Sequence, residues 1–144
     1  MHLKIKIKKN GDAKMPLYAH KGDSGADLYS SEECTLNPME RKLVPTGIRL
    51  SIPYGYEAQI RPKSGLAIEH GITHANCVGT IDSGYRGEIK IPIINLGSKP
   101  YKIEKGKKIG QMVFAKIEEV VFEEADELDA TTRNDKGFGS TGLD

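Results

Sequence analysis

Three Gly-rich polar clusters contain the residue types that could do chemistry. Asp27 lies in SGADLYS, and Lys63 is followed by Ser64 in RPKSGLA. Asp82 and Tyr85 lie close together in GTIDSGYRGEI. Backbone N–H groups at the start of a helix, with a cation nearby, bind anions. The clusters together contain two carboxylates, donors of the kind that bind phosphate, and a flat ring, but no cage of protein ligands for a metal. This combination predicts a phosphorylated substrate that brings its own Mg²⁺.

A fourth Gly-rich stretch, GFGSTG, occupies residues 137–142 and has the spacing G-x-G-x-x-G. In dinucleotide-binding folds a strand leads into these glycines and a helix follows them. Here only Leu143 and Asp144 follow, and the preceding EEADELDATTRND is charged and has no pattern of a buried strand. We therefore expect no dinucleotide site, although the glycines would still let the backbone approach a ligand closely.

Composition limits the class of partner. The formal net charge is +1, from 21 basic and 20 acidic residues, so we expect no bulk attraction to nucleic acid or to a membrane surface. No apolar run approaches the roughly 20 residues of a membrane span. Cys34 and Cys77 have no CxxC spacing, which favours two reduced thiols. The length of 144 residues predicts one domain. The expected reduced thiols and the lack of a membrane span predict a cytoplasmic location.

The sequence predicts short strands as the elements that position these clusters. HLKIKIKK alternates apolar and basic residues, with Leu3, Ile5 and Ile7 on one side, and predicts a half-buried strand. Further strands are expected in KLVPTGIRL, YEAQIR, EIKIPIINL and IGQMVFAKIEEVVF, which are separated by turn residues at close spacing. This pattern predicts an all-β sandwich or barrel.

One short helix and one terminal arm complete the expected organisation. SGLAIEHG predicts a helix with Ser64 as its N-cap. From about residue 118 the chain becomes acidic and then small and polar. We expect a β domain over residues 1–122 and a flexible C-terminal arm over residues 123–144.

Each of the three polar clusters alone is better explained as a turn, but five clusters together resemble a known family. SGADLYS, RPKSGLA, NCVGTIDSGYRGEI, GKKIGQM and RNDKGFGSTG occur in the order and spacing of the five motifs of trimeric deoxyuridine triphosphatases (dUTPases). The resemblance extends from about residue 16 to the C-terminus. It implies a distorted jelly-roll, a β-sandwich-like barrel with one short helix.

The third motif resembles the family's uracil-binding β-hairpin. The resemblance implies that Asp82 is the general base that activates water, and that the ring of Tyr85 packs on the deoxyribose and excludes a 2′-hydroxyl. The remaining contacts to the nucleotide that it implies come from Asn76, Thr80, Ile81 and Lys90.

The other motifs resemble the family's phosphate site. Lys63, Ser64 and Gly65 match the residues that hold the phosphates, with Lys63 where Arg is commoner. A Lys replaces a planar bidentate fork by a point charge. Asp27 resembles the acidic residue that meets the metal–triphosphate region through water. Gln111 resembles the glutamine that reaches the substrate from a subunit contact.

The arm resembles the family's mobile lid, which folds over the bound nucleotide. Arg133 would meet the terminal phosphates and Phe138 would stack on the uracil. Donors to the γ-phosphate would come from Gly137, Gly139, Ser140 and Thr141.

The resemblance implies hydrolysis of dUTP to dUMP and pyrophosphate, with Mg²⁺ as cofactor. Such an activity limits uracil incorporation into DNA and supplies dUMP for dTMP synthesis. The implied assembly is a homotrimer with active sites at the subunit interfaces. Two alternatives are a non-catalytic nucleotide-binding β module and a relative of the dCTP deaminase type. The latter needs a pocket glutamate and a Phe-type residue at position 85, and neither Glu57 nor Glu88 stands in its pattern.

Overall fold

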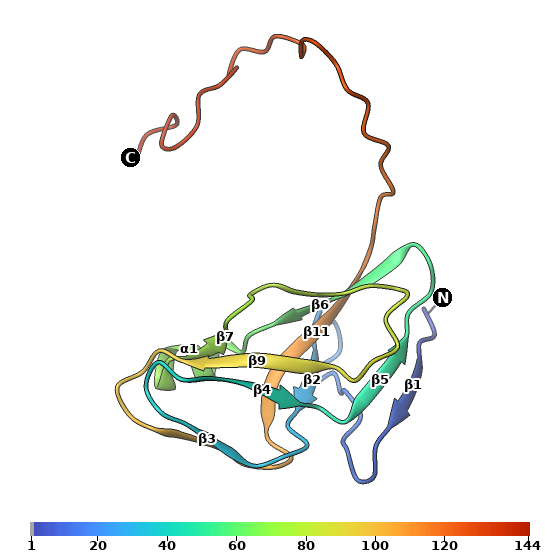
Figure 1. The fold of residues 1–144 in the computed structure, drawn as a ribbon, viewed down its shortest axis with the longest axis vertical. Coiled ribbons are helices and arrows are strands. Elements are labelled where there is room, and N and C mark those ends of the chain that lie inside the picture. Colours follow the sequence, from blue (N-terminus) through green and yellow to red (C-terminus); the bar gives the residue numbers. More distant parts are fainter. Residues whose placement is uncertain (1) are drawn as a thin grey trace.

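The computed structural model describes residues 2–144 as short strands, one helix and a long terminal arm (Figure 1). In chain order the elements are β1 (Lys6–Lys9), β2 (Ala26–Tyr29), β3 (Cys34–Leu36), β4 (Arg41–Pro45), β5 (Ile48–Ser51), β6 (Tyr56–Arg61), α1 (Ser64–His70), β7 (Ile72–His74), β8 (Gly79–Ile81), β9 (Lys90–Asn95), β10 (Tyr101–Ile103) and β11 (Lys108–Lys116). The predicted all-β fold with one short helix is confirmed.

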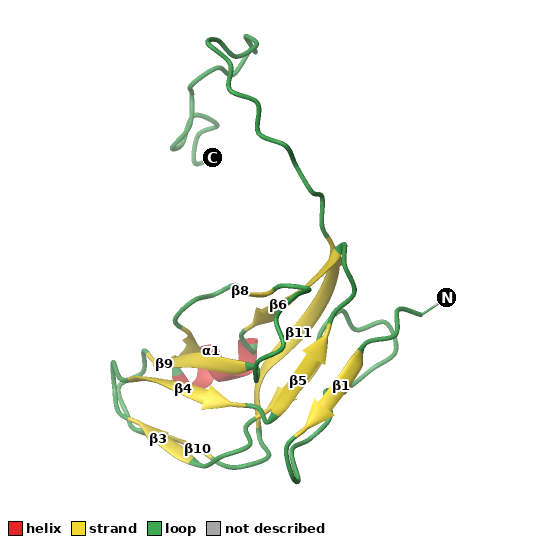
Figure 2. Ribbon diagram, turned by 45° about the vertical axis from the view of Figure 1, so that its right-hand side comes forward, coloured by secondary structure: helices red, strands yellow, loops and turns green. Residues whose placement is uncertain are grey.

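The strands form four small antiparallel sheets that enclose one core (Figure 2). The largest has the order β2-β11-β6-β8, and a second has the order β4-β9-β7. Two further pairs, β1 with β5 and β10 with β3, complete the body. Neighbours in a sheet are mostly distant in sequence, so the order of the strands could not be read from the chain.

Isoleucine fills most of the core, as expected for strands that place a β-branched side chain on every second residue. In β9, Ile91 and Ile93 are fully buried and alternate with more exposed neighbours. Asn95 continues this row and is also fully buried. Its amide donates to the carbonyl oxygens of Leu36 and Lys99 at 2.9 and 2.8 Å, so the buried polar group is satisfied.

The predicted N-terminal strand is shorter than the alternating run. Ile5 and Ile7 pack against the core, but Leu3 is exposed, and β1 begins only at Lys6. The reason is that β5 is the partner of β1, and their register pairs Lys6 with Ser51 at its end. Residues before Lys6 have no strand to pair with.

The helix is confirmed, but its N-cap is Lys63, and the prediction of Ser64 is wrong by one residue. Lys63 has extended backbone angles and accepts a hydrogen bond from the Ala67 N–H at 3.1 Å, whereas Ser64 is already helical. No side chain caps this end. At the other end Gly71 adopts a left-handed φ of 69°, which a glycine tolerates without strain.

The last strand ends earlier than the apolar pattern predicted. β11 stops at Lys116, opposite Tyr56, which is the first residue of β6. Beyond it, Val121 and Phe122 are more than nine-tenths exposed. The sequence IEEVVF therefore does not continue the strand, because no neighbouring strand extends that far.

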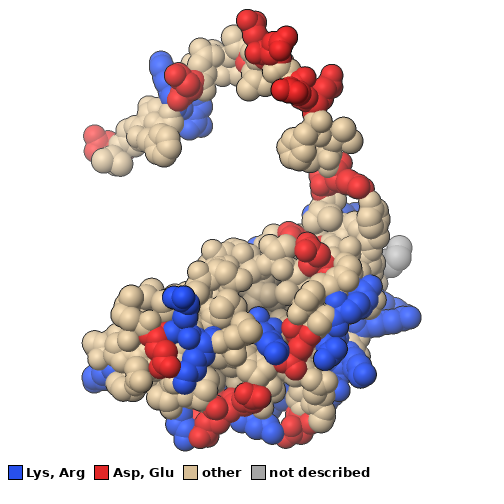
Figure 3. Space-filling view, in the orientation of Figure 1, with Lys and Arg blue, Asp and Glu red and all other residues tan. Residues whose placement is uncertain are grey.

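The arm leaves the body after two anchoring contacts. The Ile117 N–H donates to the Gly55 carbonyl oxygen at 3.0 Å, and the Tyr54 hydroxyl bonds the carboxylate of Glu119. The remaining residues arch away from the sheets, and acidic side chains line the arm (Figures 1 and 3). Like charges along a segment repel one another and favour extension. The division into a domain at 1–122 and an arm at 123–144 stays a prediction.

Within the described part of the chain, no helix has the length and apolar character that a membrane crossing requires.

Candidate active site

Asp27 is the buried centre of an ion cluster. Its carboxylate lies on β2 and is 4% exposed. Oδ1 accepts from the Lys63 ammonium at 2.6 Å, and Oδ2 accepts from the Lys108 ammonium at 2.9 Å. Lys63 comes from the start of α1 and Lys108 from the start of β11. The fold thus brings three distant segments to one carboxylate.

The two ammonium groups keep this carboxylate charged. Burial by itself raises the pKa of Asp27, but the hydrogen bonds and charges of Lys63 and Lys108 outweigh it and leave the pKa below its usual value. The hydrogen bond to Asp27 in turn raises the pKa of Lys108. A carboxylate compensated in this way is a fixed structural charge rather than a proton acceptor.

Gln111 lies beside this cluster on β11, opposite Asp27 in the ladder. Its amide nitrogen Nε2 donates to the carbonyl oxygen of Pro62, the residue before Lys63, at 3.0 Å. A Cβ on Gly25 would collide with the Gln111 side chain, so only a glycine permits this packing. The fold therefore brings Asp27, Lys63 and Gln111 together.

Asp82 lies at a separate, shallow hollow of about 250 Å³. The predicted residues that line this hollow are Thr80, Ile81, Asp82, Tyr85 and Lys90. Asn76 lies against the start of β8: its Nδ2 atom would be 3.3 Å from a Cβ added to Gly79. The third motif is thus gathered in one place.

A tight turn orients the ring at this hollow. The Tyr85 N–H donates to the Asp82 carbonyl oxygen at 3.1 Å, and the Tyr85 hydroxyl donates to the Glu88 carbonyl oxygen at 2.8 Å. The strands on either side of the turn do not pair with each other: β8 pairs with β6, while β9 pairs with β4 and β7. The expected hairpin is therefore wrong in this respect, because the segment connects two sheets.

The Asp27 ion cluster and the Asp82 hollow lie at opposite edges of the largest sheet. Asp27 is on β2 at one edge, and Asp82 follows β8 at the other edge. Three strand spacings separate these edges, about 14 Å at 4.7–4.9 Å each. One copy of the chain does not bring its two predicted carboxylates together.

The arm residues are also apart from both regions. Phe138 is fully exposed, and the Arg133 guanidinium bonds the carbonyl oxygen of its own neighbour Lys136 at 2.9 Å. Local turns shape the tip, where the Gly142 N–H donates to the Gly139 carbonyl oxygen at 3.0 Å. Gly139 has a φ of 90°, a conformation that requires glycine.

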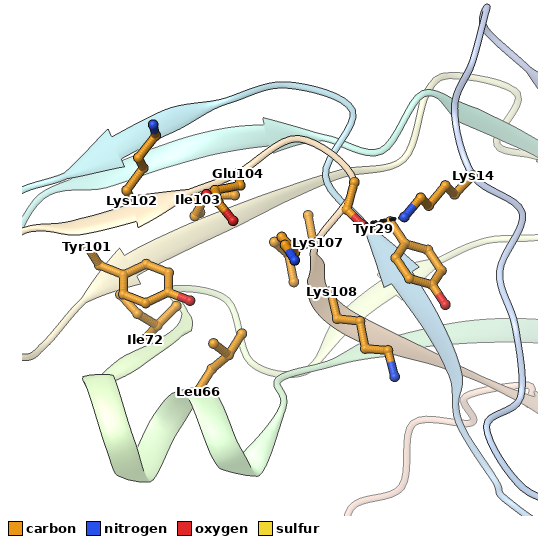
Figure 4. A pocket seen from close by; sticks show the side chains of 12 residues that line it. Lys14, Tyr29, Leu66, Ile72, Tyr101, Lys102, Ile103, Glu104, Lys107 and Lys108 are labelled. Atoms are coloured by element: carbon orange, nitrogen blue, oxygen red, sulfur yellow. Dashed lines mark hydrogen bonds between the residues drawn. The ribbon is translucent and has the colours of Figure 1, made fainter.

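A larger cavity of about 560 Å³ lies between α1, β10 and the start of β11 (Figure 4). Tyr101 and Leu66 line one side of it, and Lys14 lies over the Tyr29 ring on the other, with its nitrogen 5.1 Å from the ring centroid. Lys14 also donates to the Gly106 carbonyl oxygen. This cavity is larger than the hollow that holds Asp82 and is separate from it.

Sequence reasoning missed three residues of these two regions. Lys108 is the second cation on Asp27, and its only signal was its place in the quoted GKKIGQM. Leu43 and Glu88 line the Asp82 hollow. Glu88 had a signal, since it closely follows Tyr85, whereas Leu43 comes from β4 and no local pattern connects it to the turn.

The chain matches the family described as dUTPase over residues 11–142. The deoxyuridine 5′-triphosphate nucleotidohydrolase of Finegoldia magna is 55% identical over 142 residues, which cover 97% of this chain and 99% of the relative. The chain belongs to the dUTPase family. The enzyme of the same name from Clostridium novyi is 56% identical over 142 residues, which cover 98% of this chain and 100% of the relative.

Solved dUTPase structures share the fold. The dUTPase of Staphylococcus bacteriophage 80alpha with dUpNHpp has a TM-score of 0.91 at 28% identity, over 97% of this chain and 99% of that one. A mutant dUTPase of phage phi11 of S. aureus, described as revealing the coordination of a structural Mg(II) ion, has a TM-score of 0.81 at 25% identity, over 87% and 98%. The expected jelly-roll-like dUTPase fold is confirmed.

Proposed function

We propose that this chain hydrolyses dUTP to dUMP and pyrophosphate. The observation that carries the proposal is the presence of all five family motifs, of which the first, second and fourth converge on one ion cluster around the buried Asp27. Membership of the dUTPase family over nearly the whole chain supports the same activity. This reaction would limit uracil in DNA and supply dUMP.

In the proposed mechanism Asp82 is the general base. Its carboxylate orients a water for in-line attack on the α-phosphorus and accepts the proton as the new P–O bond forms. The bond from the α-phosphorus to the bridging oxygen breaks, and pyrophosphate leaves. Lys63, Arg133 and the N–H groups of Ser64 and Gly65 balance the charge that spreads over the phosphates.

The donor set fits a Mg²⁺ ion that arrives with the nucleotide. Within residues 2–144, no group of three or more His, Cys, Asp or Glu side chains could hold a metal. Asp27 is a lone buried carboxylate with both oxygens already bonded to ammonium groups. It would meet the ion through water, and the phosphates would supply most ligands. When bound, the ion would neutralise charge on the triphosphate.

We propose that the active site is completed in a homotrimer. Asp27 and Asp82 lie at opposite edges of one sheet, and the arm arches above its own body (Figure 1), where Phe138 is fully exposed. The arm carries large apolar side chains with nothing to contact, including Phe122, Leu128 and Phe138, each more than nine-tenths exposed. Such exposed apolar groups indicate an interaction surface. In this proposal residues 123–144 act as a separate arm on a domain of residues 1–122, and each arm closes over a neighbour's site.

The proposed location is the cytoplasm. Cys34 and Cys77 are both free thiols, and unpaired thiols are typical of a reducing compartment.

The activity is tested by a pyrophosphate-release assay over all deoxynucleoside triphosphates and UTP, with and without Mg²⁺. We expect hydrolysis of dUTP alone, and only with the metal. Ammonia release is measured in parallel with dCTP, because it would identify a deaminase instead. A protein that binds dUTP without releasing pyrophosphate would be a nucleotide-binding module.

The role of Tyr85 in sugar selection predicts a change in specificity. Tyr85→Ala should admit UTP measurably, because the ring excludes a 2′-hydroxyl by its bulk, while uracil recognition at Thr80 and Ile81 should persist. Tyr85→Phe is the matched control: it loses only the hydroxyl bond to Glu88 and should still reject UTP. The measurement is kcat/KM for UTP and dUTP. If Tyr85→Ala still rejects UTP and loses dUTP binding, the ring has only a packing role.

A further inference from the structure

One buried carboxylate is shared by two lysines, with one oxygen for each. Lys63 occupies Oδ1 of Asp27 and Lys108 occupies Oδ2, at 2.6 and 2.9 Å. The Asp27 side chain is 4% exposed, whereas the side chains of Lys63 and Lys108 are 29% and 49% exposed. The carboxylate is therefore fixed inside the protein, and the two cations reach it from the solvent side.

The use of lysine at position 63 makes this sharing possible. An arginine fork bonds both oxygens of a carboxylate at once, whereas an ammonium is a point charge that needs only one. With lysines at 63 and 108, each cation has its own acceptor. Either can leave Asp27 while the other remains bonded to it.

Such independence matters because the proposed function gives Lys63 a second partner. In this structure Lys63 is bonded to Asp27, but during the reaction it must contact the substrate phosphates. A buried carboxylate left without any partner is strongly destabilised. Lys108 supplies the partner that stays.

We propose that Lys108 is a positioning residue, which holds the Asp27 carboxylate in place while Lys63 turns from Asp27 to the triphosphate. The inference rests on the proposed function and extends it to a residue that acts through Asp27 rather than on the substrate. Without Lys108, Lys63 is the only cation bonded to Asp27. The attraction of the carboxylate then keeps Lys63 at Asp27 and opposes its contact with the phosphates. The loss should therefore appear in nucleotide binding more than in the chemical step.

The adjacent residue provides a matched control. Lys107 has the same charge and lies one position away, but it forms no ion pair among the described residues. The Lys107 N–H donates to the Glu104 carbonyl oxygen, and the Lys107 carbonyl oxygen accepts from the Ser30 N–H. These backbone bonds do not depend on the side chain. Lys107→Gln therefore reproduces the change in net charge and leaves the Asp27 cluster intact.

The first experiment measures KM and kcat for dUTP and the Kd of dUpNHpp, a dUTP analogue, at saturating Mg²⁺. Lys108→Gln should raise KM and Kd about tenfold, as expected for a lost charge-assisted hydrogen bond, and should change kcat less than about threefold. Lys107→Gln should leave all three within about twofold. Thermal melting of each variant checks folding. A Lys108→Gln protein that resembles Lys107→Gln in binding would overturn the proposal, even if its melting temperature falls.

A double-mutant cycle tests whether Lys108 acts through Asp27. In an Asp27→Asn background, Lys108→Gln should weaken dUpNHpp binding no further, because its acceptor charge has gone. If the two losses multiply instead, Lys108 contacts the nucleotide directly and the proposal is wrong. Should Asp27→Asn not fold, the same cycle with Asp27→Ala, which also removes the acceptor charge, gives the same expectation.

Failure of this inference is distinct from failure of the proposed function. A wild-type protein that hydrolyses dUTP while Lys108→Gln behaves as the control overturns the inference alone. A wild-type protein that neither hydrolyses dUTP nor binds dUpNHpp overturns both.

Discussion

Asp82→Asn should leave the fold and dUTP binding nearly intact and lower kcat by about 10²–10⁴, the usual range for the loss of a general base. The physical reason is that the amide keeps the size of the carboxylate but cannot accept the proton of the attacking water. Folding should survive because Asp82 is exposed and its carboxylate makes no ion pair or hydrogen bond among the described residues. Single-turnover kinetics with dUTP and the Kd of dUpNHpp separate the chemical step from binding.

A charge-matched control excludes a general effect of the lost negative charge. Asp12→Asn removes an exposed carboxylate that pairs with Lys105 at 2.9 Å and lies outside the Asp82 hollow. Exposed ion pairs contribute little, so kcat should stay within about twofold. If Asp82→Asn instead weakens binding and keeps its rate at saturation, Asp82 holds the substrate and another group is the base.

The sequence predicted the strands where one face of a strand is buried. β9 is the clearest case, since the buried Ile91 and Ile93 alternate with more exposed residues as its pattern requires. Strand ends were less predictable, because a strand ends where its partner ends. Phe122 continues an apolar run in the sequence, yet the pairing of β11 with β6 ends at Lys116 and Tyr56, so Phe122 is exposed.

The candidate site was predictable where a single motif contains the residues and also determines the local turn that positions them. The turn from Asp82 to Tyr85 is local, so its sequence specifies it. The Lys108–Asp27 ion pair is not local, because it depends on the register of β2 with β11. Leu43 likewise reaches the Asp82 hollow from another sheet. Contacts of this kind need the three-dimensional arrangement of the strands.

Removal of residues 133–144 should leave a folded trimer with dUTPase activity lowered by about 10² or more, since even one lost donor to a transition state costs that much. The core lies upstream, and the last backbone bond of the arm to the body is at Ile117. Circular dichroism and mass measurement check the fold and the assembly. A truncated protein that retains full activity would exclude the arm from the site.

The truncated protein and the Asp82→Asn protein together test which subunit the arm serves. Each parent lacks one component: the truncated chain has Asp82 but no arm tip, and the Asp82→Asn chain has the tip but no base. The two are unfolded, mixed in equal amounts and refolded, and mixed trimers are confirmed by mass. In a ring where every subunit gives its arm to a neighbour, one half of the sites have the base, and one half of those have the tip.

Activity of the mixture should therefore rise to about one quarter of the wild-type value per site, far above the sum of the parents. Each parent refolded alone under the same conditions is the control and should stay nearly inactive. The alternative gives a qualitatively different result. If an arm closes over the Asp82 of its own subunit, no subunit in the mixture has both components, and mixed trimers recover no activity. The arm has the length to reach a neighbour, since 28 residues from Ile117 to Asp144 span several tens of ångströms when extended. The full exposure of Phe138 leaves the arm tip without a partner on its own body, and recovery of activity in the mixture would establish the shared site.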